Sequence, residues 1–461
     1  MNPITSPATA NSGPKLFTVG TLSYTQKGIV MLFFWLMWND FCLTLFEGVQ
    51  TFVNILFKNN GASNMIIGFS GSMFGILCLV INPVISTYSD RYRGKYGRRR
   101  PFLILAAPPL AVATMALPYM PELGKYMTRY PGLVTFWNHL GINGPVFFIG
   151  VCFVVLSLFN LVILSLFTYY WWDVVPEEVL GRFTGLSQII ATVARFIFGF
   201  FLLGYGEFHL KQLCFGLGLF FMAFYLVSTW RVKEGEYPPP EPRKSGNGPW
   251  SMIKTYFNDC YTKPRYLWVF GALCLYQLGN GGNMYQYFYV WKDLGLSLDT
   301  IGKFTSVTAF IPFVAGYSMG SLADKFKPVR LMGPCLLGLA TTSLISYYCI
   351  TGKWSLLICT GLAQIPGFAF GVFLGALTVE VYPRAKLGQF CSAASVMSVF
   401  FGTFSGPLLG LLFDHLKNNR MGYLWSAGFQ VMSAYCFFRI YHTWKKLHPD
   451  QLLPGEAPEP A

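Results

Sequence analysis

Residues 146–171 read VFFIGVCFVVLSLFNLVILSLFTYYW and contain no charged side chain. The segment is longer than the roughly 20 residues that an α-helix needs to cross the hydrocarbon core of a bilayer. A surface helix of a soluble protein would carry charged residues on the face that meets water. The segment therefore predicts a helix that spans a membrane.

The rest of the chain has the same character. Hydrophobic residues make up 53% of its 461 residues and charged residues only 12%, whereas a soluble domain carries roughly 25% charged residues. Lipid permits so little charge because apolar side chains can face outward. Apolar stretches of similar length predict an all-α membrane protein with twelve transmembrane helices, near residues 29–53, 64–88, 102–119, 146–171, 184–204, 212–230, 267–290, 301–322, 330–350, 355–378, 389–412 and 422–442.

Positive charge is distributed unevenly over the segments between these spans. An even number of spans puts both termini on one side of the membrane. Of the 34 Lys and Arg residues, 24 lie on that side when Arg439, near the end of the last span, is counted with it. Nine lie on the other side, and Arg195 lies deep within a span. Because cytoplasmic loops carry the excess of Lys and Arg, we expect a multi-pass protein of the cell (inner or plasma) membrane with both termini in the cytoplasm. This bias accounts for the net charge of +14 without a nucleic-acid partner.

A polar segment divides the chain into two halves. Residues 231–266 contain Pro238-Pro239-Pro240 and Ser245-Gly246-Asn247-Gly248, which are typical of a linker. We expect this cytoplasmic linker to join two six-helix bundles and the chain to begin and end in cytoplasmic tails. The corresponding boundaries are 1–28 for the first tail, 29–230 for the first bundle, 231–266 for the linker, 267–443 for the second bundle and 444–461 for the second tail.

Two landmarks repeat in the two halves. Asp90 follows the second predicted span, and Asp324 follows the eighth, 234 residues later. Asp173 begins Asp-Val-Val-Pro after the fourth span, and Glu380 begins Glu-Val-Tyr-Pro after the tenth, 207 residues later. We therefore expect a duplicated unit and two pseudo-symmetric bundles around a central site, which is a common plan among transporters.

Ionisable residues lie inside two of the predicted spans. Asp40 and Glu47 share one face of the first span, since they are seven residues apart, and Arg195 lies in the fifth span at a depth similar to that of Asp40. Such residues are costly in lipid and mark transport pathways. We expect Asp40, Arg195 and the neighbouring Asn39 to bind solute hydroxyl groups through paired hydrogen bonds, with Asp40 or Glu47 also taking up a proton. A structural ion pair between the two helices is the alternative.

Amide side chains in the seventh span predict the contribution of the second half. Gln277, Asn280 and Asn283 follow one another at three-residue steps, among glycines that would weaken the helix. Irregular backbone is tolerated in a membrane where it lines a cavity. We therefore assign these amides to the binding site, with hydrogen bonding between helices as the alternative. Further candidates within other spans are Trp38, whose ring could stack on a sugar, and the polar residues Gln188 and Asn160.

The loop between the second and third spans combines an acid with many bases. Asp90 is followed within ten residues by Lys95 and by five arginines, namely Arg91, Arg93, Arg98, Arg99 and Arg100. An acid at this point can pair with the basic turn or with a helix N-terminus, forming a latch that breaks when the two halves rock. The recurrence at Asp324-Lys325 favours this gating role, because arginines that only set the topology need no acid.

The same loop carries a family resemblance. Residues 82–101, NPVISTYSDRYRGKYGRRRP, resemble the loop between helices two and three of the major facilitator superfamily. The ending Gly-Arg-Arg-Arg-Pro resembles that of the sucrose–proton symporters and of the related glycoside–pentoside–hexuronide symporters, such as melibiose permease. The resemblance implies two six-helix bundles, alternating access, and a sugar site with an acid in helix one and an arginine in helix five, as at Asp40 and Arg195. Sodium-coupled members carry carboxylates on helix two where this chain has Cys78 and Asn82, so proton coupling or uncoupled diffusion is expected instead.

The sequence as a whole predicts a secondary transporter of a sugar or glycoside, in symport with protons, that has no cofactor and no bound metal. An enzyme is not expected, because the chain has no HExxH, GxGxxG or P-loop motif and its five His residues are scattered. The eleven Cys residues form no CxxC pair and are expected to be buried thiols. Two alternatives stay open: a major facilitator transporter of a lipid-like or other organic solute, since fold does not set substrate, and a membrane receptor or scaffold that transports nothing.

Overall fold

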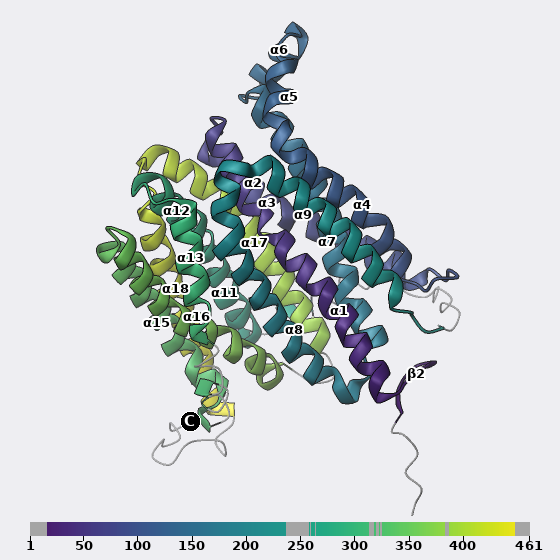
Figure 1. Cartoon of the computed structure of the whole chain (residues 1–461). Helices are drawn as coiled ribbons and strands as arrows, with labels where there is room; N and C mark the ends of the chain where they lie inside the picture. Colours follow the sequence, from purple (N-terminus) through teal and green to yellow (C-terminus); the bar gives the residue numbers. More distant parts are fainter. Residues whose placement is uncertain are drawn as a thin grey trace, which may run out of the picture.

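Long helices dominate the computed structural model of the chain (Figure 1). A short hairpin of β1 (Phe17–Val19) and β2 (Leu22–Tyr24) precedes them, within the segment that the sequence predicts as a tail. Asp324 and most of the predicted linker lie outside the described residues. The structure describes residues 16–236, 258, 260–262, 264–312, 318–319, 322, 325–382 and 387–447.

The first half begins with α1 and ends with α9. A 3₁₀ turn at Leu117–Tyr119 joins α4 to α5, and a π-helical turn, η2 (Phe198–Leu202), joins α8 to α9. The helices are α1 (Gln26–Glu47), α2 (Val49–Asn59), α3 (Asn64–Arg91), α4 (Arg100–Ala116), α5 (Met120–Met127), α6 (Pro131–His139), α7 (Gly144–Val174), α8 (Glu177–Ile197) and α9 (Leu203–Arg231).

The second half begins with a broken helix. α11 ends at Asn280 and α12 begins at Asn283, so the backbone is interrupted where the sequence predicts weakness. The helices are α11 (Pro264–Asn280), α12 (Asn283–Phe288), α13 (Leu298–Thr308), α15 (Pro328–Cys349), α16 (Lys353–Val381), α17 (Leu387–Leu416) and α18 (Met421–Leu447).

A helix lies in each of the twelve predicted spans, although α13 is described only for the first part of the eighth. Eight helical segments of the described residues are long and apolar enough to cross a membrane, and the one at Glu177–Arg231 covers two predicted spans. The chain bends between those two spans at His209, where the backbone leaves the helical region (φ −125°, ψ 41°). The prediction of an all-α membrane protein with two helical bundles is confirmed.

Helix packing defines the two bundles and the seam between them. In the first half α4 packs against α7 and α9, and α1 packs against α8 and α9. In the second half α11 packs against α17 and α18, and α15 packs against α16 and α18. The halves meet through α3 against α17 and through α13 against η2 and α9. Among the described residues, the contact between the bundles therefore lies along two seams, one formed by α3 and α17 and the other by α13 with η2 and α9.

Apolar side chains cover much of the outside of the molecule. Leu105 is 73% exposed, Val84 64% and Phe208 81%. Water would make such exposure costly at about 25 cal/mol per Å² of apolar surface, whereas lipid does not. The helix of the third predicted span, α4, continues through the 3₁₀ turn into α5, beyond the predicted end of that span. Figure 1 shows α5 and α6 projecting past one end of the bundle.

Candidate substrate-binding site

A cavity of about 810 Å³ lies between the two halves. Its walls come from α1 and α8 of the first half and from α13 and α16 of the second half, and they include the rings of Phe198 and Phe368. A space of this size accommodates a small organic solute. The polar side chains of the wall are Thr44, Glu47, Gln188, Thr192, Arg195, Thr305, Ser306 and Gln364.

The two acids of α1 share one face of the helix, and one of them, Glu47, reaches this cavity. Asp40, Thr44 and Glu47 are four and three residues apart, so their side chains lie above one another. Thr44 and Glu47 line the cavity. Asp40 lies one turn further along the helix and accepts a hydrogen bond of 2.6 Å from Ser187 Oγ of α8. The two carboxylates of α1 thus lie on the side of the helix that faces α8.

Glu47 also borders a second, smaller cavity. This space of about 30 Å³ lies between α1, α2, α3 and α7, and its wall includes Gln50, Ser157 and Asn160. Asn160 Oδ1 is buried and has no hydrogen-bond partner among the described residues. The space is large enough to hold a water molecule, and a buried acceptor needs a donor. One water molecule in this space could connect Asn160 to Glu47.

The cavity side of α8 carries the positive charge. Gln188, Thr192 and Arg195 are spaced by four and three residues and all line the cavity. The side chain of Arg195 is exposed there, and it makes no hydrogen bond or ion pair with another described residue. It interacts electrostatically with both Asp40 and Glu47. The structure therefore brings Asp40, Glu47 and Arg195 together, and their role in binding stays a prediction.

The neighbours of Asp40 on α1 point elsewhere. Asn39 is fully buried between α1 and α9, where its Nδ2 donates to Thr229 Oγ1 at 3.4 Å and its Oδ1 accepts a hydrogen bond from Ser228. Trp38 packs against aromatic rings of its own half, and the centroid of its ring lies 5.7 Å from that of Phe224. In this conformation Asn39 holds two helices together, and neither residue is part of the cavity wall.

The predicted amides of α11 also lie away from the cavity wall. Gln277 packs beside Gly402 of α17. The Cγ atom of Gln277 lies 3.1 Å from the position that a Cβ atom on Gly402 would occupy. The carbonyl groups near the break in the helix are satisfied by α18, since Trp425 Nε1 donates to Leu278 O at 2.9 Å and Ser426 Oγ donates to Gly279 O at 2.9 Å. These bonds involve the backbone, so the role of the three amide side chains stays a prediction. Asn280 and Asn283 flank the break and are likewise not part of the wall.

The second half instead contributes Gln364 of α16 and the hydroxyl groups of α13. Our sequence interpretation did not single out Gln364. A signal was present, because Gln364 is the only amide side chain in the predicted span 355–378. Thr305 and Ser306 gave no comparable signal, since hydroxyl groups are common in membrane helices and usually bond to their own backbone.

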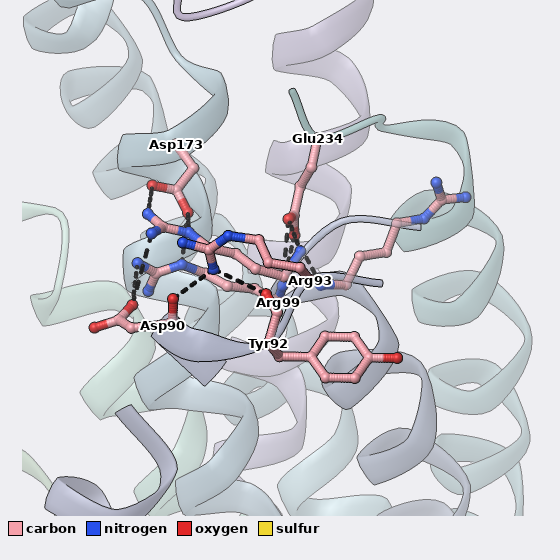
Figure 2. A network of polar contacts seen from close by, with 8 residues as sticks. Asp90, Tyr92, Arg93, Arg99, Asp173 and Glu234 are labelled. Carbon is pink, nitrogen blue, oxygen red and sulfur yellow. Dashed lines mark hydrogen bonds and ion pairs between the residues drawn. The ribbon is translucent and has the colours of Figure 1, made fainter. Parts of the chain in front are cut away.

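A second polar network lies at the end of the first half that carries Arg98, Arg99 and Arg100, which we call the basic end (Figure 2). Asp173 at the end of α7 accepts from both Arg98 and Arg99, at 2.6 Å in each ion pair. Arg99 also forms an ion pair with Asp90, in which its Nη2 atom lies 3.1 Å from Oδ1. The predicted pairing of Asp90 with the basic turn is thus present in the structure.

Glu234 completes this network at the start of α4. Its carboxylate accepts hydrogen bonds from the backbone N–H groups of Arg98, Arg99 and Arg100 at 2.6, 3.1 and 2.7 Å. Burial raises the pKa of Glu234, and these three N–H groups counteract the rise. Arg100 donates in addition to Trp230 O. The sequence gave no signal for Glu234, because it lies well over a hundred residues from the helix that it caps.

The partners named here lie in the first half or, for Glu234, directly after α9, so the network ties together the ends of α3, α4, α7 and α9. The side chain of Arg91 is exposed. Lys325 in the second half lies over the ring of Phe326 at 5.4 Å, and Asp324 lies outside the described residues. A gating role for this loop, formed and broken between the halves, stays a prediction.

Comparisons with known proteins match this architecture. A family described as MFS/sugar transport protein matches residues 16–373. The chain is similar in structure to the nucleoside transporter NupG (D323A mutant), with a TM-score of 0.65 and 13% identity over 89% of this chain and 100% of that chain. It is also similar to a D-xylose–proton symporter (TM-score 0.62, 16% identity, 89% of this chain and 97% of that chain). A bacterial homologue of the iron transporter ferroportin in an inward-facing state matches with a TM-score of 0.65 and 14% identity, over 90% of this chain and 99% of that chain.

Proposed function

The chain belongs to the family of MFS/sugar transport proteins, and from this premise we propose that it moves a sugar or glycoside across the membrane by alternating access, in symport with protons. Membership of the family makes the chain a multi-pass membrane transporter of a small molecule. The finer proposal is carried by one observation: Arg195, which makes no hydrogen bond or ion pair with another described residue, and Glu47 both line the cavity between the bundles, and Asp40 lies close enough to interact electrostatically with Arg195. The resemblance of residues 82–101 to the sucrose–proton and glycoside–pentoside–hexuronide symporters supports a sugar as the solute.

Solute binding in this proposal uses groups from both halves. The guanidinium group of Arg195 offers paired N–H donors to neighbouring hydroxyl groups. Gln188 from the same helix and Gln364 from the opposite half each add a donor and an acceptor. Phe198 and Phe368 supply apolar surface for the face of a sugar ring. A solute held by both halves senses their relative position, which is what coupling of binding to rocking requires.

Proton coupling follows from the charges around Arg195. While Asp40 and Glu47 are ionised, both attract the guanidinium group. Protonation of either acid weakens this attraction and leaves Arg195 free for solute hydroxyl groups. We assign the proton to Glu47 in the first place, because it lines the solute cavity and also borders the small cavity beside Asn160. Binding of a proton and of a sugar would then favour each other, as linkage demands.

The orientation in the membrane is part of the proposal. The basic end, with Arg98, Arg99 and Arg100, is placed in the cytoplasm because Lys and Arg residues accumulate on the cytoplasmic side. The N-terminal tail, the linker 231–266 and the C-terminal tail would then also be cytoplasmic. The opposite end, where α3 begins and α17 ends, would face the outside of the cell membrane.

Uptake into proteoliposomes tests the proposal. Radiolabelled monosaccharides and disaccharides, a nucleoside and an amphipathic organic solute are supplied with and without an inward proton gradient. We expect uptake of a sugar that the gradient stimulates, that Arg195→Ala abolishes and that Glu47→Gln uncouples from the gradient. Glu122→Gln, which changes an exposed acid outside the cavity, serves as the control and should transport normally. Uptake of only a non-sugar solute would refute the assignment of a sugar, and normal uptake by Arg195→Ala would refute the binding site.

A further inference from the structure

Two matching hydrogen-bonded contacts join the halves at the end opposite the basic end, which we call the far end. Asp414, close to the end of α17 in the second half, accepts from the backbone N–H groups of Asn64 and Met65 at 3.1 and 3.2 Å. These two groups belong to the first turn of α3 in the first half. Glu207, in α9 of the first half, accepts from the backbone N–H group of Leu298 at 3.0 Å, at the start of α13 in the second half.

The sequence repeat relates these two contacts to each other. Residues 64–91 align without gaps with 298–325 at the offset of 234 that separates Asp90 from Asp324. Residues 173–207 align without gaps with 380–414 at the offset of 207, and both segments end in an acid. By these offsets Asn64 corresponds to Leu298, and Glu207 corresponds to Asp414. The same acid of each half therefore caps the same helix of the other half.

Each capped helix also has a serine cap of its own. Ser63 Oγ accepts from Ile66 N at 3.3 Å, and Ser297 Oγ accepts from Thr300 N at 3.3 Å, again at an offset of 234. The serine moves with its own helix and keeps its bond when the halves separate. The acid belongs to the other half and loses its bond. The carboxylate contacts therefore stabilise only the arrangement in which the far end is closed.

The physical basis is the electrostatics of a helix start. The first N–H groups of a helix have no partner within the helix, and the helix dipole adds positive charge there. An ionised carboxylate at this point makes charge-assisted hydrogen bonds, which are stronger than neutral ones. Asp414 and Glu207 supply such a carboxylate to both capped helices, and separation of the halves would leave the N–H groups to water.

The same repeat places two tight backbone crossings beside the caps. A Cβ atom on Gly68 of α3 would lie 2.0 Å from the carbonyl oxygen of Gly406 in α17. At the corresponding crossing, a Cβ atom on Gly302 of α13 would lie 2.1 Å from the carbonyl oxygen of Gly199 in η2. Gly199 is also part of the cavity wall. The crossing of Gly199 with Gly302 thus adjoins the solute cavity, and each capped helix starts four residues before its own crossing glycine.

We propose that Asp414 and Glu207 are two pseudo-symmetric carboxylate latches that hold the far end closed and must release their helices before the cavity opens to that side. The inference rests on the proposed alternating access but not on the identity of the solute. Each latch stabilises the closed far end separately, so their effects on the ratio of open to closed molecules multiply. Loss of one charge-assisted cap raises the open population about tenfold, and loss of both raises it about a hundredfold.

Hydrogen exchange of the full-length protein in lipid nanodiscs tests the latches, without any solute. Backbone exchange is measured in peptides that cover the starts of α3 (residues 62–68) and α13 (residues 296–302). The variants are Asp414→Asn, Glu207→Gln and their combination, and Asp414→Glu tests rescue by a conservative change. Glu122→Gln is the matched control, because Glu122 pairs with Lys211 within the first half.

We expect each single variant to accelerate exchange about tenfold in both peptides, including the one that the mutated acid does not touch. The combined variant should accelerate exchange further, and Asp414→Glu and the control should stay close to the wild type. Acceleration confined to the peptide next to the mutated acid would show local fraying and would overturn the proposal. Failure of one variant to fold leaves the other, on the opposite seam, as an equal test. Because no solute is added, a protein that transports no sugar can still show the coupled exchange.

Discussion

A single methyl group at the crossing of α3 and α17 is expected to shift the protein away from the conformation described here. In Gly68→Ala the new Cβ atom would lie 2.0 Å from the carbonyl oxygen of Gly406 and 2.5 Å from its carbonyl carbon. Non-bonded Cβ contacts are essentially never shorter than 3.0 Å, so the two backbones must move apart by about 1 Å at this point. Backbone cannot rotate away as a flexible side chain can, and the strain falls on the closed far end.

The magnitude follows from overpacking energies. Forcing an extra methyl group into a tight contact costs about 1–3 kcal/mol. A cost of about 2 kcal/mol that disappears when the halves separate changes the ratio of open to closed molecules about thirtyfold. Gly302→Ala at the corresponding crossing should act in the same way, since its Cβ atom would lie 2.1 Å from Gly199 O. Gly71→Ala is the matched control, because nothing lies within 4 Å of a Cβ atom there, on the same helix.

Hydrogen exchange in nanodiscs measures this shift without labels, which suits a chain with eleven cysteines. We expect faster exchange at the starts of both α3 and α13 in Gly68→Ala and wild-type exchange in Gly71→Ala. Exchange in Gly68→Ala that is indistinguishable from the control would refute the reasoning. That result would mean that the two helices separate at no cost, and hence that the crossing does not set the conformation.

Three further outcomes are expected, for the basic end, for the solute cavity and for Gln277. Asp173→Asn should lower the free energy of unfolding by about 3 kcal/mol, because it leaves Arg99, whose side chain is only 7% exposed, without a full counter-charge. Thermal unfolding in detergent measures this loss. A loss as small as that caused by Glu122→Gln, which breaks an exposed ion pair, would contradict the prediction. Arg195→Lys should retain only a few per cent of uptake, since an ammonium group lacks the paired donors of guanidinium, and near-normal uptake would exclude paired recognition. Gln277→Ala should leave the selectivity among sugars unchanged in competition assays, because Gln277 packs beside α17; altered selectivity would instead place it at the solute.

Composition and the apolar spans predicted the helices well, because the length of a membrane helix is set by the bilayer and its surface must be apolar everywhere. Asp40, Glu47 and Arg195 could be selected for a similar reason: each is costly at its depth unless it meets a partner or a cavity. The sequence also predicted the break in the seventh span, where glycines separate α11 from α12. These features depend on one helix and its solvent, and they can be calculated from neighbours along the chain.

Features that need two helices were harder to predict. Gln277 and Gln364 are both amides within apolar spans, yet only Gln364 faces the cavity. The rotation of each helix about its axis decides this, and the packing of neighbouring helices sets that rotation. The same reason applies to Asn39, which adjoins Asp40 in sequence but points to α9. Adjacent residues on a helix project about 100° apart, so one of a polar pair must face away from the cavity.

The sequence by itself determined the membrane environment, the spans, the duplication and the presence of buried charge, because each of these follows from local hydropathy or from an internal repeat. Only the tertiary structure decided which faces of the helices meet. It brought Asp173 and Glu234 to the arginines of the basic end and placed Arg195 in the cavity, where it makes no hydrogen bond or ion pair with another described residue. It also showed that Asp414 and Glu207 cap helices of the opposite half. The reason is physical: a helix start is a binding site for a carboxylate only when the fold brings the two within about 3 Å, and that distance depends on how whole bundles pack together.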